Sequence, residues 1–294
     1  MRTYLDCIPC FFKQALEASR LAGASKSTQK KILRKIAQGI PSLSLKKTPP
    51  EMGQAIYGQV AKMTKKKDPY LKIKQKSNRL ALRLYKKLKN KVSSSKDSLL
   101  VALELAIAGN IIDYGVKNSL NVTEELDKIL RYEHKLIGKE SKKFFDYETF
   151  RKKLKKSKTI LYLGDNAGET VFDRIFIEEI KKKYPKKRVL YAVKEKPIIN
   201  DALAKDAYFC GIHKSAEIIS SGLDLPGTVL PKCTPAFRRI FNKADIIISK
   251  GQGNFEALGK RGNLFFLFMA KCPVVARHVG CNIGDIILLQ NKKM

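Results

Sequence analysis

The segment ILYLGDNAGETVFDRIFIEEI, residues 160–180, decides the fold because it contains the end of one element and the start of another. A short apolar run, 159–163, is followed by two glycines together with Asp165, Asn166 and Glu169, and then by an amphipathic pattern. A short apolar run that stops at glycines is typical of a buried strand, and the pattern after it is typical of a helix. The segment therefore predicts a strand–loop–helix unit whose loop carries three polar side chains.

The same alternation continues to the end of the chain. Buried strands that alternate with helices form parallel βαβ units, so we expect a doubly wound, mostly parallel sheet in residues 151–294. The other strand-like runs are 188–193, 245–249, 264–268 and 285–289, and the helical patterns are 169–184, 200–206 and 234–242.

The first part of the chain has a different texture, with apolar residues at helical spacing and no strand-like runs. We expect an all-helical domain in residues 1–150, joined to the α/β domain by a lysine-rich segment at 138–158. The predicted helices are 10–22, 27–39, 50–64, 70–92, 97–118 and 122–136.

The net charge of +32 raises the question of nucleic acid or an acidic membrane as a partner. The lysines are spread along the whole chain, however, and lysine far outnumbers arginine, which base and phosphate readers favour. We interpret the charge as a solvated surface that also attracts anionic substrates, so we expect neither a nucleic-acid nor a membrane partner. Because the start of the chain lacks an apolar signal region and no run could span a bilayer, we expect a cytoplasmic protein.

Polar side chains follow three of the predicted strands. Asp165, Asn166 and Glu169 follow the first strand, and Asn200 and Asp201 follow the second. The sequence KGQGNFEA, residues 250–257, follows the third, 245–249. In a doubly wound sheet, the site lies outside the carboxyl ends of the strands, so these groups should converge. Carboxylate and amide oxygens suit Mg²⁺ or Mn²⁺, and Lys250 adds a charge for a phosphoryl group. The alternative is that these loops are only turns and helix caps.

Several other nucleotide and hydrolase motifs are absent from the sequence. There is no G-x-x-x-x-G-K-[ST] loop, no G-x-S-x-G elbow and no H-E-x-x-H helix. The stretch GQGNFE begins like a dinucleotide fingerprint, but Glu256 stands where the third glycine is required. The three histidines, at 134, 213 and 278, are isolated from one another and are expected to be structural.

The combination of LYLGDNAGETVFDRIFIEEI, KPIINDA and SKGQGNFEAL, with AGNIIDYG upstream, resembles the damage-control phosphatase family, also called domain of unknown function 89. The resemblance runs from CIPC at residues 7–10 to GDIILL at 284–289. The order and spacing of these motifs are similar to those of the metal-dependent, single-chain prokaryotic branch of the family. It implies a helical N-terminal part on a Rossmann-like α/β domain. It also implies a phosphatase that acts on phosphometabolites with Mn²⁺, Co²⁺, Ni²⁺ or Mg²⁺.

The resemblance also assigns roles to residues of this chain. It implies that Asp165, Asn166 and Asp201 bind the metal and act in catalysis, and that Lys250 grips the transferring phosphate. A further group is implied to bind substrate in the same pocket, with Glu256 a weaker candidate: Glu169, Asn254, Gly253, Asn110 and Asp113. The reaction is then hydrolysis of a small phosphomonoester, either by water or with Asp165 as a nucleophile.

Two cysteines, Cys7 and Cys10, form the one C-x-x-C of the sequence. Such a pair is half of a zinc or iron–sulfur site, and no second pair is present, so the alternatives are a metal or redox role and simple packing at the first helix. The remaining cysteines, at 210, 233, 272 and 281, are expected to be small core residues.

Two other functions compete with the phosphatase hypothesis. A basic nucleic-acid-binding protein would explain the charge but not the acidic loops. An S-adenosylmethionine-dependent carboxyl methyltransferase would explain a Rossmann-like fold without a metal. The sequence leaves the substrate, the metal and the oligomeric state undetermined.

Overall fold

The described residues of the first part of the chain are mostly helical, as predicted. The computed structural model describes residues 1–109, 143–259 and 261–290. The remainder of the predicted helix 97–118, all of 122–136, and both Asn110 and Asp113 lie outside the described residues. The helices of this part are α1 (Cys7–Leu21), α2 (Lys26–Gly39), α3 (Pro49–Thr64), α4 (Leu71–Ser94) and α5 (Ser98–Ala108).

The second part forms one six-stranded sheet in the order β3-β2-β1-β4-β5-β6. The strands are parallel except β6, which runs antiparallel to β5. This is the mostly parallel, doubly wound sheet that the alternating pattern predicted. Its strands are β1 (Thr159–Leu163), β2 (Arg188–Val193), β3 (Glu217–Ser220), β4 (Ile246–Lys250), β5 (Leu264–Met269) and β6 (Ile286–Gln290).

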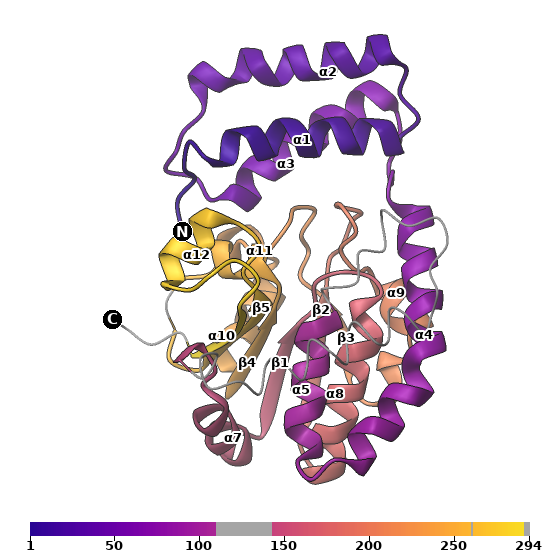
Figure 1. Cartoon of the computed structure of the whole chain (residues 1–294), viewed down its shortest axis with the longest axis vertical. Coiled ribbons are helices and arrows are strands. Elements are labelled where there is room, and N and C mark those ends of the chain that lie inside the picture. The colour runs from indigo at the N-terminus through magenta and orange to yellow at the C-terminus, as the bar shows by residue number, and fades with distance from the viewer. Residues whose placement is uncertain (110–142, 260, 291–294) are drawn as a thin grey trace.

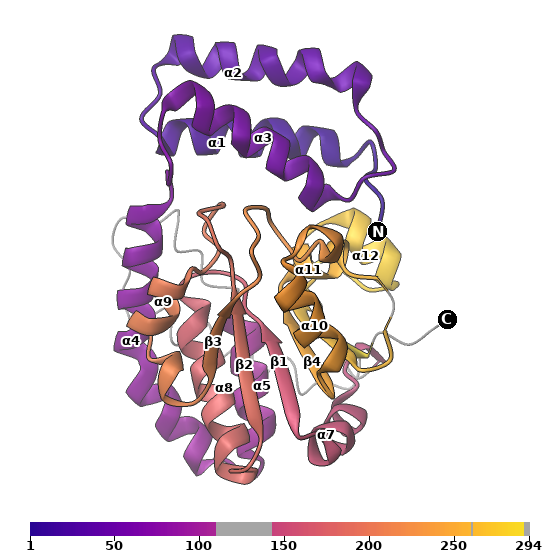
Figure 2. The ribbon, with the colours of Figure 1, turned by 180° about the vertical axis from the view of Figure 1, so that it is seen from behind.

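Helices cover both faces of the sheet because successive strand residues point to opposite sides. Ile160 and Tyr162 join the core that α4, α5 and α8 (Glu169–Lys183) make on one face. Leu161 and Leu163 join a second core with α10 (Pro235–Lys243) on the other face. Figure 2 shows these layers from behind.

The helices α1, α2 and α3 form a separate layer across the carboxyl ends of the parallel strands, as Figure 1 shows. They enclose a core of their own, which includes Phe11, Ile32 and Ile56. The chain enters α3 through a capping box, in which the Thr48 N–H donates to Glu51 Oε2 at 2.9 Å. The layer therefore covers the edge of the sheet where the sequence predicts a site.

Several elements differ from the prediction, among them two short helices that it does not include, α11 (Gln252–Ala257) and α12 (Pro273–Val279). The segment 138–158 is not merely a connector, because 147–156 forms α7 (Tyr147–Lys156), whose buried Phe150 and Leu154 are hidden among lysines in the sequence. The periodicity does not predict β3, a four-residue edge strand whose side chains are half-buried or exposed. The helix expected at 200–206 is α9 (Ala204–Phe209), because the residues before it form the turn that carries Asp201.

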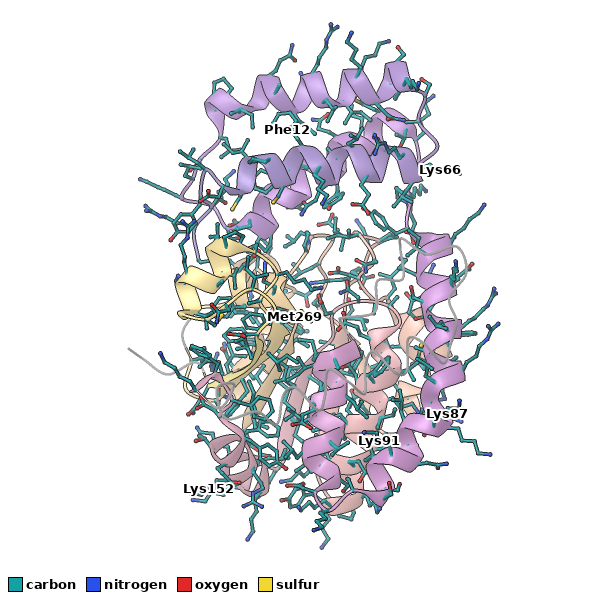
Figure 3. All side chains as sticks on the ribbon, viewed as in Figure 1. Phe12, Lys66, Lys87, Lys91, Lys152 and Met269 are labelled. Atoms are coloured by element: carbon teal, nitrogen blue, oxygen red, sulfur yellow. The ribbon has the colours of Figure 1, made fainter. Side chains whose placement is uncertain are left out.

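The lysines lie on many parts of the surface. Lys66, Lys87 and Lys152 are exposed on separate elements and point outward (Figure 3). Within the described residues, no helix combines the length and the apolar character that crossing a membrane requires.

Candidate active site

The backbone brings Asp165, Asn166 and Asp201 together at the carboxyl ends of β1 and β2. Asn166 and Asp201 pair as an antiparallel bridge between the two loops. The Ala167 N–H donates to the Asn200 carbonyl, and the Ala202 N–H donates to the Asp165 carbonyl, both at 2.8 Å. The convergence of these two strand ends, expected from the order of the elements, is therefore held by main-chain hydrogen bonds.

The side chain of Asn166 links the acids of the first loop. Its Nδ2 donates to Asp165 Oδ2 at 3.1 Å and to Glu169 Oε1 at 2.7 Å. Both amide hydrogens are then used, so the amide oxygen is the atom that Asn166 can offer to a ligand.

Gly251 is required at the end of β4 because the chain passes very close to Asp165. A Cβ built on Gly251 would lie 2.1 Å from Asp165 Oδ2, and the backbone has φ +82°. Glycine alone combines this conformation with this approach. Gly251, the first glycine of KGQGNFEA, thus lets the loop after β4 lie directly against the loop after β1.

The acids of the site are buried close together, and the Lys194 ammonium lies 3.6 Å from Asp201 Oδ2. Burial raises the pKa of Asp165 well above its usual value, and repulsion by Glu169 and Asp201 adds to the effect. Burial also raises the pKa of Asp201 to about 6, although Lys194 and Lys74 oppose the shift. Buried, mutually repelling carboxyl groups of this kind are common at functional sites.

Lys250 lies beneath this site rather than in the pocket. Its ammonium is completely buried and contacts Glu169 Oε2 at 3.1 Å and Asp173 Oδ1 at 2.8 Å. Burial favours a lower pKa for this lysine, but Asp173 and Glu169 together hold the pKa above its usual value. The hydroxyls of Tyr162 and Tyr191 donate to Asp173 at 2.6 and 2.8 Å. Lys250 thereby supports Glu169, which in turn holds Asn166.

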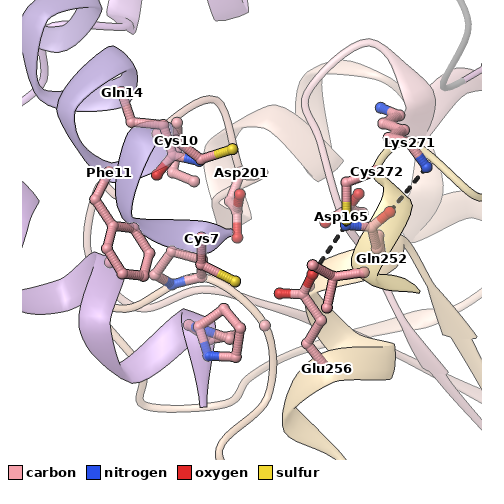
Figure 4. Close-up of a pocket in the computed structure, with 18 of the residues that line it drawn as sticks. Cys7, Cys10, Phe11, Gln14, Asp165, Asp201, Gln252, Glu256, Lys271 and Cys272 are labelled. Atoms are coloured by element: carbon pink, nitrogen blue, oxygen red, sulfur yellow. Dashed lines mark hydrogen bonds between the residues drawn. The ribbon is translucent and has the colours of Figure 1, made fainter. Parts of the chain in front are cut away.

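The acids open into a pocket of about 560 Å³ between the helical layer and the sheet. Cys7 and Cys10 enter it from α1, while Gln252 and Glu256 enter it from α11 (Gln252–Ala257), as Figure 4 shows. Gly253, Lys271 and Cys272 also line it. Glu256 accepts a hydrogen bond from Gln252 at 2.8 Å, and burial raises its pKa to about 7.

The structure brings most of the predicted residues to the pocket, but only some of them line it. Asp165, Asn166, Asp201 and Gly253 line the pocket, whereas Glu169 and Lys250 lie below it. Asn254 is also buried, and its Nδ2 donates to the Lys250 carbonyl at 2.7 Å.

The sequence reasoning missed Lys271, which lines the pocket just after β5. Lys271 could have been predicted, because it follows the carboxyl end of β5, and sites in such sheets lie at the carboxyl ends of the strands. The sequence reasoning missed Asp173 as well, because an acid inside an amphipathic helix gives no sign that it faces a buried lysine. Of the other cysteines, Cys210 and Cys233 are buried as expected, but Cys272 and Cys281 are only half-buried.

The residues present fit a hard divalent cation. Asp201 Oδ2 is buried without a hydrogen bond, although the Lys194 ammonium lies 3.6 Å away, and Asp201 pairs with Asn166, whose amide oxygen is available. Two carboxylates and one amide form an all-oxygen set of the kind that Mg²⁺ and Mn²⁺ prefer. Within the part of the chain that the structure describes, no three His, Cys, Asp or Glu side chains form a metal cluster by themselves, and this candidate set contains two such residues and one amide.

The sheet order, the helical layer and the acidic pocket define a Rossmann-like α/β protein with its site at the carboxyl ends of the strands. The family model for the damage-control phosphatase ARMT1-like domain matches residues 3–287. The chain therefore belongs to the damage-control phosphatase family, domain of unknown function 89.

Individual relatives agree with this assignment. A damage-control phosphatase of Pyrococcus horikoshii is 35% identical over 301 residues, which cover 99% of each chain. One of Archaeoglobus fulgidus is 34% identical over 235 residues, which cover 79% of each chain. A crystal structure of a Pyrococcus horikoshii protein of the same family has a TM-score of 0.89, with 31% identity, and covers 99% of this chain and 100% of that one. These relatives support a phosphatase of the metabolite damage-control type.

Proposed function

We propose that this protein is a metal-dependent phosphatase that hydrolyses small phosphomonoesters, such as sugar phosphates or damaged and side-product phosphometabolites. Asp165, Asn166 and Asp201 would hold the cation, which would be Mn²⁺, Co²⁺, Ni²⁺ or Mg²⁺. The observation that carries the proposal is the pairing of the Asn166 and Asp201 loops, which leaves the buried Asp201 Oδ2 without a hydrogen bond. The Lys194 ammonium lies 3.6 Å from this oxygen, too far for a good hydrogen bond, so the oxygen can still accept a bond from a ligand or bind a cation.

The electrostatics of the pocket support a cation at the same place. The raised pKa values of Asp165 and Asp201 reflect burial together with acids that repel one another. A bound divalent ion would add positive charge to this group and would stabilise the charge that develops on the phosphoryl oxygens.

The chain's own residues account for substrate binding. Lys271 lines the pocket and lowers the pKa of Asp165 by its charge, so it lies within electrostatic reach of the acids. It is therefore suited to hold the phosphate as a point charge. Lys250 would have to leave both Glu169 and Asp173 to take that role, so we assign it to holding Glu169 and Asn166 in place.

The test is hydrolysis of p-nitrophenyl phosphate by metal-stripped protein to which each of the four cations is returned. We expect activity only with added metal, and we expect Asp165→Asn to abolish it. Asp245→Asn is the matched control, since Asp245 precedes β4 at the opposite end of the sheet, where its carboxylate accepts hydrogen bonds from the Lys158 and Thr159 amides.

The outcomes separate the parts of the proposal. Metal binding without hydrolysis of this ester or of a panel of phosphometabolites would overturn the reaction but keep the site. Absence of metal binding in folded protein would overturn the site itself. A higher KM for substrate in Lys271→Ala, with the metal affinity unchanged, would support the role of Lys271 in phosphate binding.

A further inference from the structure

Ile199, in the loop after β2, has a backbone conformation that its side chain disfavours. Its φ is +42°, in the left-handed region, where β-branched residues are rare. Among the described residues that are not glycine, Lys65 is the other with a positive φ. Lys65 follows α3 as an exposed helix end, a position where this conformation is common, so Ile199 is the unusual case.

The strain lies in the tight turn that presents Asp201. The Asp201 N–H donates to the Ile198 carbonyl at 3.1 Å, which makes Ile199 the first of the two central residues. Turns with a positive φ at this position usually carry glycine, asparagine or aspartate there. An isoleucine at this point costs free energy that the surrounding structure must offset.

The compensation comes from the helical layer. Ile198 is 5% exposed and belongs to the core that α1, α2 and α3 enclose, and Ile199 packs against the same core. Within the described part of that core, these two residues alone come from the sheet domain. Ile199 also borders both the 560 Å³ pocket and a second pocket of about 530 Å³ beneath α3. The loops that follow β2 and β3 rise toward this layer in Figure 2.

The other side of the turn is bonded to the loop after β1. The Asn200 carbonyl accepts the Ala167 N–H, and the Ala202 N–H donates to the Asp165 carbonyl. One short turn therefore contacts the helical layer with its side chains and the first candidate ligand loop with its backbone.

We propose that Ile199 is a positioning residue, which the helical layer clamps in a strained turn so that Asp201 stays beside Asp165 and Asn166. The nature of the ligand at these residues rests on the proposed function, but the positioning itself does not. The layer is then more than a lid over the pocket, because its core fixes the place of one ligand residue.

The experiment compares Ile199→Gly and Ile199→Val with wild type by hydrogen–deuterium exchange of the metal-free protein and by calorimetric titration with Mn²⁺. Glycine relieves the strain but removes the anchor, whereas valine keeps a β-branched anchor. Lys65→Gly is the matched control, because it makes the same relief of a positive φ at a residue that lines neither pocket. Unfolding of all variants is followed in urea.

We expect Ile199→Gly to remain folded, to speed exchange at Ala167 and Ala202, and to weaken Mn²⁺ binding by about tenfold or more. Ile199→Val and Lys65→Gly should keep wild-type exchange and affinity. Unchanged exchange in Ile199→Gly, or equal effects in Lys65→Gly, would overturn the proposal. If wild type bound no Mn²⁺, the metal site would fail, and the exchange rates would still decide whether Ile199 positions the turn.

Discussion

The two ends of the sheet treat polar groups in opposite ways. At the amino end of the strands, polar side chains form hydrogen bonds with backbone N–H and C=O groups. Asp245 Oδ2 accepts the N–H groups of Lys158 and Thr159, both at 2.8 Å. The buried Lys187 ammonium donates to the Ser157 carbonyl and, at 3.2 Å, to the Lys155 carbonyl. These contacts give hydrogen-bond partners to backbone N–H and C=O groups near the start of β1.

At the carboxyl end, buried polar groups are left incomplete. Asp201 Oδ2, Ser249 Oγ and Asn254 Oδ1 are buried there without hydrogen bonds. Within the described residues, the other such atoms belong to Asp68 and Lys74, an ion pair with a 2.7 Å contact near the start of α4. None of these atoms lies at the amino end.

The difference indicates what each end is for. A satisfied buried group stabilises the fold, whereas an unsatisfied one costs about 1–3 kcal/mol and persists where function requires it. The carboxyl end therefore gives up stability that a ligand can return. Variants at matched positions of the two ends can test this contrast.

The largest effect should come from the two buried lysines. Lys250→Met leaves Glu169 and Asp173 buried without their cation, which should lower the free energy of unfolding by about 3–5 kcal/mol. Lys187→Met removes hydrogen bonds to two carbonyls and the Ser157 hydroxyl and a contact with the Tyr184 ring, but no carboxylate partner of the described residues at salt-bridge distance, and should cost about 1–2 kcal/mol. Urea denaturation of both variants at neutral pH measures the two costs.

A second substitution identifies the cause of the Lys250 effect. Adding Asp173→Asn to Lys250→Met should restore part of the stability, because one uncompensated charge is removed. Equal costs for Lys250→Met and Lys187→Met would contradict the view that charge pairing distinguishes the two ends.

Metal should stabilise the carboxyl end alone. A cation that binds only the folded protein adds about 2.7 kcal/mol at a hundred times its dissociation constant. Wild type and Asp245→Asn should both gain this stability when Mn²⁺ is added to stripped protein, whereas Asp165→Asn should gain none. Thermal unfolding with and without chelator provides the measurement, and a gain in Asp165→Asn would place the cation elsewhere.

The pH dependence of metal-free protein should reveal Asp201. Its pKa is raised from 3.8 to about 6 in the folded state, so the folded protein binds the extra proton between these values. Stability from this group should therefore fall as pH rises from about 4 to about 6. Asp201→Asn should remove that part of the slope in urea titrations across this range, and an unchanged slope would exclude Asp201 as its source.

The sequence predicted the strands that carry the site because buried parallel strands are continuous apolar runs. The runs 159–163 and 188–193 match β1 and β2 to the residue, and the acids after them converge as expected. The short edge strand β3 was not predicted, because its side chains are half-exposed and its sequence contains no continuous apolar run. The boundary near residue 150 and the roles of the pocket residues stay predictions.

The support beneath the site could not be predicted, since it depends on contacts between distant residues. Lys74 stands in a helix full of solvated lysines and looks like any of them, yet it is completely buried. Lys250 looked like a phosphate ligand because it ends a strand, and only the packed structure shows Asp173 and Glu169 around it. The strain at Ile199 is likewise invisible in a sequence, because an apolar pair such as Ile198-Ile199 gives no sign of a turn.

The smallest expected effect lies at the amino end and should have the opposite pH dependence. Hydrogen bonds from the Thr159 and Lys158 amides lower the pKa of Asp245 below its usual 3.8. The stability from Asp245 should therefore be complete above pH 3.8 and be lost as pH falls through the lower folded pKa. Because the side chain is exposed, Asp245→Asn should cost only about 1 kcal/mol at pH 7, and the difference from wild type should vanish in strong acid. Urea denaturation at pH 7 and pH 2.5 measures both values, while phosphatase activity should not change. A cost that grew on acidification would show that the amino end, too, holds a strained charge, and the contrast between the two ends would fail.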